Sequence, residues 1–216
     1  MKKTIISLFL LATLSLQAQN YKPETYLGVN GGVTLSQVNF IPVVKQSMLQ
    51  GLDGGLTFRY ISESHFGLII ESNLAQRGWK ENFTDTTLSY SRTLNYLEIP
   101  FLTHVTFGNH KYRFFVNLGP KVAFLLSDKE KRNFTNKLLE EHGKTIDNRL
   151  DYGLVGGAGF ELRTGVGCFL LEGRYYYALS DVFSNAKKEY FDRSANNSIS
   201  VNLTYLIPWQ KLNLSK

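Results

Sequence analysis

The sequence predicts an all-β fold, an eight-stranded antiparallel up-and-down transmembrane β-barrel with short periplasmic turns and long extracellular loops. Three observations lead to this prediction. Apolar and polar side chains alternate along eight separate stretches of the chain, and a period of two is typical of strands with two unlike faces. The connections between these stretches are alternately short and long, as in outer-membrane barrels. The chain also begins with the layout of a secretion signal.

The first residues predict a cleaved secretion signal. Met1-Lys2-Lys3 is a short cationic start, an uncharged and mostly apolar stretch runs from Thr4 to Leu16, and Ala18 is a small residue suited to cleavage. At 1.5 Å per residue the apolar stretch would cover roughly 20 Å as a helix, which is short of a hydrocarbon core of about 30 Å. We therefore expect residues 1–18 to be removed and residues 19–216 to form one barrel domain.

The eight alternating stretches are expected to be the strands. The second stretch shows the pattern well, because Leu52, Leu56 and Phe58 alternate with polar Asp53 and Arg59. Each stretch suits the 9–11 residues that a tilted strand needs to cross a bilayer, or is somewhat longer. The predicted strands are 26–36, 51–61, 65–78, 92–106, 111–125, 150–163, 167–181 and 196–207.

The connections predict which end of the barrel faces outward. The short connections are 62–64, 107–110 and 164–166, and we expect them to be periplasmic turns. The long polar connections, at 37–50, 79–91, 126–149 and 182–195, are expected to be extracellular loops. The longest loop holds the one helix candidate, residues 136–142, which starts at Asn136 and stops before Gly143. Phe134, Leu138 and Leu139 would form a small apolar stripe on it.

The composition of the two faces favours a membrane barrel over a soluble one. One face carries large apolar side chains such as Phe58, Leu118 and Phe160, and the other carries charged residues and glycines. An eight-stranded interior is only just wide enough to be filled by side chains, so glycines there would let long charged side chains cross and pair. The predicted polar network of the lumen consists of Asp53, Arg59, Glu71, Glu98, Arg113, Lys121, Glu161, Arg163, Glu172 and Arg174.

Aromatic residues near the strand ends are expected at the two membrane–water interfaces. Tyr26, Tyr60, Tyr112 and Tyr205 lie towards the turn side, and Tyr152 lies towards the loop side. Tyrosine rings favour the interface because one end of the side chain is apolar and the other is polar.

Charge and cysteine content exclude several classes of protein. Removal of the signal takes away two lysines and no acids, so the formal net charge becomes 22 − 18 = +4. That charge is mild and mixed along the chain, which argues against a nucleic-acid partner. The single cysteine, Cys168, cannot form an internal disulfide.

Several segments resemble the PorT-like outer-membrane β-barrel proteins of Bacteroidetes, in the order and spacing of that family. One is Leu-Asn-Tyr-Leu-Glu-Ile-Pro at 94–100, in which Tyr-Leu-Glu-Ile-Pro is the most specific piece. The others are Gly-Leu-Asp-Gly-Gly-Leu at 51–56, Leu-Gly-Pro at 118–120 leading to Phe-Leu-Leu-Ser at 124–127, Asp-Tyr-Gly-Leu-Val-Gly-Gly-Ala-Gly at 151–159, and Glu-Gly-Arg-Tyr-Tyr-Tyr at 172–177 with Leu-Ser-Asp at 179–181.

The resemblance implies a fold and a location more than an activity. Its founding member is tied to secretion and surface assembly of exported proteases. The resemblance therefore implies a Gram-negative outer membrane, with outer-membrane lipids around the barrel. The loop 126–149 is the richest in charged residues; it is the candidate site for a secretion or envelope protein as partner, and the alternative is a solvated loop whose helix lies over the barrel mouth.

No residue pattern predicts an active site, a cofactor site or a metal site. His65, His104, His110 and His142 are scattered along the chain, and no nucleophile completes a catalytic set. His104, on the polar face near Glu98, could act as a base, but a place in the polar network is the favoured interpretation.

Three hypotheses of function remain. The favoured one is a non-enzymatic outer-membrane barrel that acts as a structural or interaction platform, linked to protein secretion or surface assembly. The alternatives are a lipid-modifying or hydrolytic outer-membrane enzyme, and a soluble lipocalin-like carrier of an apolar ligand.

Overall fold

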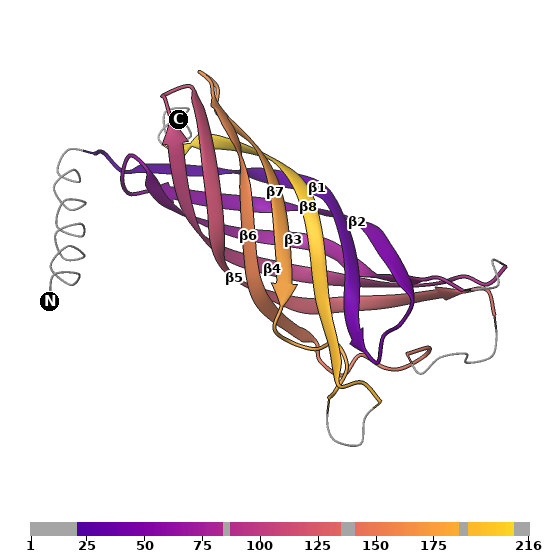
Figure 1. Cartoon of the computed structure of the whole chain (residues 1–216). Helices are drawn as coiled ribbons and strands as arrows, with labels where there is room; N and C mark the ends of the chain where they lie inside the picture. Colours follow the sequence, from indigo (N-terminus) through magenta and orange to yellow (C-terminus); the bar gives the residue numbers. More distant parts are fainter. Residues whose placement is uncertain (1–20, 84–86, 135–140, 186–189, 210–216) are drawn as a thin grey trace, which may run out of the picture.

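The computed structural model describes residues 21–83, 87–134, 141–185 and 190–209. Within these ranges eight antiparallel strands close into a barrel in up-and-down order, with β1 paired to β8 (Figure 1). The strands are β1 (Glu24–Ile41), β2 (Gln46–Ile61), β3 (Phe66–Glu81), β4 (Tyr90–Gly108), β5 (Tyr112–Arg132), β6 (Leu150–Arg163), β7 (Cys168–Ala178) and β8 (Arg193–Pro208). The predicted fold class is confirmed. In the described part of the chain no helix is both long and apolar enough to cross a membrane.

The two faces of the wall are those of a membrane barrel. Large apolar side chains point outward, including Phe114 at 66% exposure and Leu118 at 61%, and charged side chains point into the barrel. This facing excludes the soluble carrier hypothesis, since a lipocalin-like barrel would hold its apolar side chains in the lumen.

The strands are longer at the outer end than the sequence predicts. The expected loop 37–50 is largely strand, because β1 reaches Ile41 and β2 starts at Gln46, leaving only 42–45 as the connection. The expected loop 126–149 is also strand as far as Arg132. Beyond the bilayer both faces of a strand meet water or loops, so the strand ends lose their apolar alternation and look like loops in sequence.

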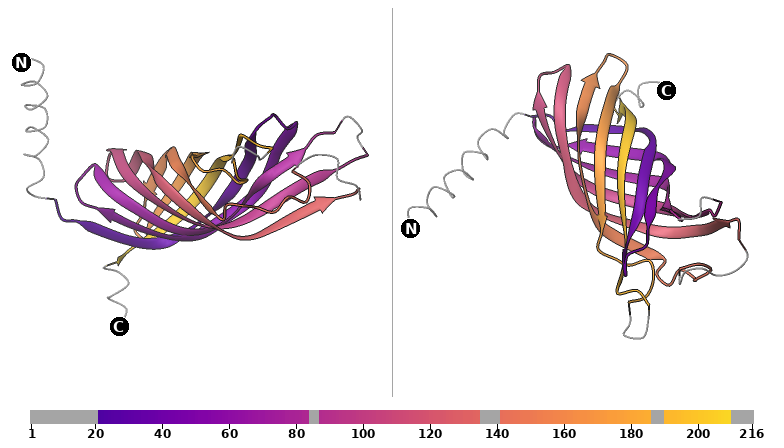
Figure 2. Two further views of the ribbon diagram at one scale, coloured as in Figure 1. Left: turned by 90° about the horizontal axis from the view of Figure 1, so that it is seen from below. Right: turned by 45° about the vertical axis from the view of Figure 1, so that its right-hand side comes forward.

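The outer ends of β3, β4 and β5 project past the rest of the barrel (Figures 1 and 2), with the end of β3 at Glu81 paired to the start of β4 at Tyr90. β5 pairs with β6 only as far as Phe124, opposite Leu150, whereas it pairs with β4 as far as Arg132, opposite Tyr90. The backbone N–H of Leu125 still donates to the backbone oxygen of Arg149, so the strand is paired on one side only from residue 126 onward. We call residues 126–132 of β5, with their β4 partners, the projecting ribbon.

Two further expectations concern the secretion signal and the tyrosines at the membrane–water interfaces. The expected signal, residues 1–18, lies outside the described residues and stays a prediction. Tyr26 does not join the interfacial aromatics, because it is 5% exposed and points inward beneath Arg59, whose guanidinium carbon lies 4.3 Å from the ring centre. Tyr60, Tyr112 and Tyr152 do point outward.

Candidate functional site

The barrel interior is filled by ion pairs that join strands on opposite sides of the barrel, across the lumen. Arg174 on β7 forms a bidentate pair with Glu71 on β3, at 2.6 and 2.7 Å, and a further hydrogen bond of 2.8 Å to Glu172. Near the turn side, Arg59 on β2 reaches Glu161 on β6 at 3.1 Å. Charge-assisted and bidentate pairs of this kind are the strongest polar contacts available in a dry interior.

The other predicted lumen residues have partners of several kinds. Arg163 binds Glu161 at 2.9 Å, and Lys121 binds Glu98 at 2.8 Å. Asp53 has no ion pair among the described residues and instead accepts hydrogen bonds from Thr34 and Asn202. Arg113 lies at the turn end, where it donates to the backbone oxygens of Asn109 and Ser64.

Sequence reasoning missed two members of this network. Arg77 on β3, 1% exposed, pairs with Glu98 and with Asp151 on β6. Arg77 falls near the end of its predicted strand and Asp151 near the start, where the alternation is weakest. Adding one base and one acid leaves the network with equal numbers of acidic and basic side chains.

Glycines make room for these long side chains. A Cβ atom at Gly157 would lie 2.4 Å from Glu172 Oε1 and 3.0 Å from Arg174 Cγ, so only glycine lets the two charged residues lie against β6. The space that remains in the middle of the lumen is a cavity of about 20 Å³, enough for about one water molecule. The ion pairs and their neighbours therefore fill most of the middle of the lumen.

His104 does not contact Glu98. Its Nδ1 lies 2.7 Å from the side-chain oxygen of Asn117, and its ring packs 5.1 Å from the ring centre of Phe115. Asn117 in turn donates to Glu172. His104 is fully buried in this chain of contacts, as the network interpretation expects.

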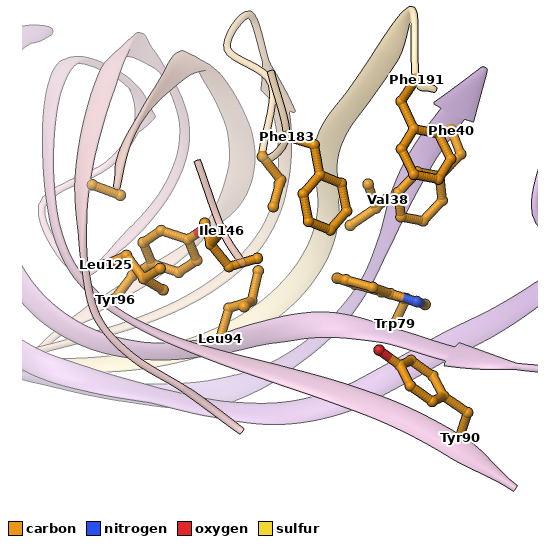
Figure 3. Close-up of a cluster of buried hydrophobic side chains, with 12 residues drawn as sticks. Val38, Phe40, Trp79, Tyr90, Leu94, Tyr96, Leu125, Ile146, Phe183 and Phe191 are labelled. Carbon is orange, nitrogen blue, oxygen red and sulfur yellow. The ribbon is translucent and has the colours of Figure 1, made fainter. Parts of the chain in front are cut away.

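A cluster of apolar side chains, not predicted from the sequence, closes the outer mouth of the barrel (Figure 3). Phe40 and Trp79 pack edge to face with ring centres 5.3 Å apart. From the last outer connection, Phe183 stacks on Phe40 and on Phe191, and Phe191 packs at a tilt against Phe40. We call this group the mouth plug; its buried members are Val38, Phe40, Trp79, Tyr90, Leu94, Tyr96, Ala123, Leu125, Ile146, Val182, Phe183 and Phe191. The inner face thus carries the ion pairs and two smaller apolar clusters at membrane depth and towards the turns, and this larger apolar cluster under the loops.

Beside the mouth plug, the structure brings together one group of metal-ligand residue types among those it describes. Glu81 at the end of β3 meets Glu141 and His142, with their ligand atoms all within 4.8 Å of one another. His142 Nε2 lies 2.7 Å from Glu81 Oε2. Burial, aided by the nearby charge of Glu81, raises the pKa of the Glu141 carboxyl to about 7. We call these three residues the mouth triad.

The predicted helix 136–142 lies mostly outside the described residues. Its described end, Glu141 and His142, forms a turn, and Gly143 follows with a φ of 70° and a backbone N–H that donates to Glu130. Phe134 of the expected apolar stripe packs against the mouth plug; Leu138 and Leu139 are outside the described residues.

A model of the outer membrane protein beta-barrel domain family matches residues 17–184, well over half of the chain. The chain belongs to this family. With its apolar outer wall and filled lumen, this member is an outer-membrane β-barrel protein of the bacterial outer membrane. The narrower likeness to PorT-like proteins stays a prediction.

Several solved barrels are similar to this family member. Ail, the attachment invasion locus protein of Yersinia pestis, is 14% identical over 85% of this chain and 99% of its own, with a TM-score of 0.43. OprG from Pseudomonas aeruginosa is 13% identical over 88% and 96%, with a TM-score of 0.47. Outer Membrane Protein W of E. coli is 14% identical over 85% and 98%, with a TM-score of 0.40. None of the curated proteins matches the chain.

Proposed function

We propose that this protein is a non-enzymatic, solute-impermeable barrel that presents its projecting ribbon to a protein partner at the cell surface. The observation that carries the proposal is the pairing of β5, which continues along β4 to Arg132 after β6 has ended. The edge of residues 126–132 that faces away from β4 carries backbone N–H and C=O groups, which a partner strand can bind. The filled lumen, in contrast, leaves room for about one water molecule in its central cavity.

The chemistry of the ribbon indicates what kind of partner it would accept. Lys129, Lys131 and Arg132 are exposed along it, together with Asp128. Such charges discourage self-association of an edge strand, so the edge suits a specific partner of complementary charge better than a second copy. A secreted or envelope protein is the class that the PorT-like resemblance suggests.

Site-specific photo-crosslinking in native outer membranes tests the proposal. A benzophenone-bearing amino acid would replace Lys129 on the ribbon or, as a matched control, Lys111 in the periplasmic turn; both lysines are exposed. We expect a discrete protein adduct from position 129 and none of that mass from position 111. Only lipid adducts at 129, or the same protein adduct at both positions, would show that the ribbon is not a docking edge.

A further inference from the structure

The mouth triad has the composition and geometry of a transition-metal site. From these contacts we propose that Glu81, Glu141 and His142 bind a divalent ion of the zinc class, which joins the β5–β6 connection to the end of β3. One imidazole nitrogen and two carboxylate oxygens are ligands that Zn²⁺ accepts, with metal–ligand distances of about 2.0–2.2 Å. Three protein ligands would leave a fourth position for water.

The ligand atoms are already close to the spacing that one ion needs. Two ligands on a tetrahedral zinc ion lie roughly 3.3 Å apart. In the structure His142 Nε2 and Glu81 Oε2 are 2.7 Å apart, and the full set lies within 4.8 Å. Shifts of about an ångström or less within side chains, of the size that rotamers allow, would therefore seat the ion.

The burial of the triad points to a missing positive charge. Glu81, Glu141 and His142 are only 4%, 1% and 2% exposed. Glu141 Oε1 is fully buried and accepts no hydrogen bond from an N–H or hydroxyl group of the described residues; the group that it faces is the Glu81 carboxyl. Two carboxyl groups held together out of water are costly unless a cation or a proton neutralises them. The neighbouring Arg92 does not pair with either carboxylate, because its Nε and Nη2 donate to Asp128 and its Nη1 donates to the backbone oxygen of Glu141.

Surrounding residues hold the ligands in position, as the outer contacts of metal sites do. The indole Nε1 of Trp79 donates to Glu81 Oε1 at 3.1 Å, which fixes that carboxylate and turns its other oxygen towards His142. The His142 ring stacks on Tyr90 with ring centres 4.2 Å apart. Gly143, with its left-handed φ, turns the chain immediately after the two loop ligands.

Metal titration of the tag-free full chain, folded in detergent micelles, tests this site. Isothermal titration with Zn²⁺ should give one saturable site, and Glu141→Gln, which keeps the shape of the side chain, should weaken it at least about tenfold. His110→Ala, which removes an exposed histidine from the periplasmic turn, is the matched control and should leave binding unchanged.

Tryptophan fluorescence locates the ion independently. The chain has two tryptophans, so Trp209→Phe leaves Trp79, which contacts Glu81, as the only reporter. Co²⁺ should quench this emission, and Glu141→Gln should shift the quenching to higher Co²⁺ concentration. If no site saturates, or if Glu141→Gln leaves both readouts unchanged, the carboxyl groups are neutralised by a proton alone and the proposal is wrong. Crosslinking at the ribbon does not depend on this result.

Discussion

Arginine introduced at Leu118 tests which face of the wall contacts lipid. Outward tyrosine rings mark the two membrane interfaces. On β5 the turn-side interface lies at Tyr112, and the loop-side interface lies at Val122, which is paired with the outward Tyr152 of β6. Leu118 lies near the middle of this span and is 61% exposed on the outer wall. An arginine on the lipid face near the midplane costs about 2–4 kcal/mol, and near an interface about 0–1 kcal/mol.

Leu126 offers a matched control on the same strand. It is 51% exposed and lies four residues beyond Val122, so a tilted strand with a rise of about 3.3 Å per residue carries it roughly 10 Å above the aromatic level. Leu118→Arg should therefore lower the folding equilibrium constant roughly 30- to 700-fold, at about 1.4 kcal/mol per factor of ten. Leu126→Arg should change it by less than about fivefold.

Equilibrium unfolding by denaturant from phosphocholine vesicles measures both variants, with electrophoretic mobility as a second probe of the folded barrel. Equal losses, or a larger loss for Leu126→Arg, would refute the assigned span. Asn117 on the opposite face is an unsuitable control, because it is 1% exposed and hydrogen-bonded to both His104 and Glu172. Arginine there would break both contacts and overfill the lumen, so it should also be damaging.

Three further predictions concern the lumen and the packing of the strands. In planar bilayers the protein should show no steady conductance, since the central cavity holds about one water; a reproducible large channel would contradict the filled lumen. Glu71→Ala leaves Arg174 without its bidentate partner and should cost about 3–5 kcal/mol in vesicle unfolding; a change below about 1 kcal/mol would mean that the pair is hydrated. Gly119→Ala places a Cβ 1.9 Å from the backbone oxygen of Phe101 and should destabilise by about 1–3 kcal/mol, whereas Gly173→Ala meets nothing within 4 Å and should be nearly neutral.

The strand faces could be predicted from the sequence because a strand has a strict period of two. Once Leu118 is placed outside, Asn117 and the other odd positions of that strand must point inward. The same rule led to charged pairs such as Arg59 and Glu161, although it could not say which acid meets which base. That choice depends on the closed order of the strands and on side-chain lengths across the lumen.

The outer end could not be predicted in the same way. The mouth plug uses aromatic residues such as Phe183 and Phe191, which lie in a connection without any period. The mouth triad joins Glu81 to His142 across 61 positions of sequence, and neither residue type nor spacing marks them as neighbours. Tyr26 was misplaced because a tyrosine at a strand end suits an interface as well as a stack beneath Arg59.

The salt bridges that cross the lumen have a consequence for how the barrel assembles. Glu71 and Arg174 are 103 positions apart and lie on β3 and β7, which are not neighbours in the wall. No hairpin formed early can join them, so their charges must stay hydrated while the sheet is still open. Water leaves only when β8 meets β1, and the backbone hydrogen bonds between β1 and β8 then form together with the cross-lumen pairs. A sheet that is not yet closed has neither the β1–β8 hydrogen bonds nor the cross-lumen pairs, which makes closure a cooperative, all-or-none event.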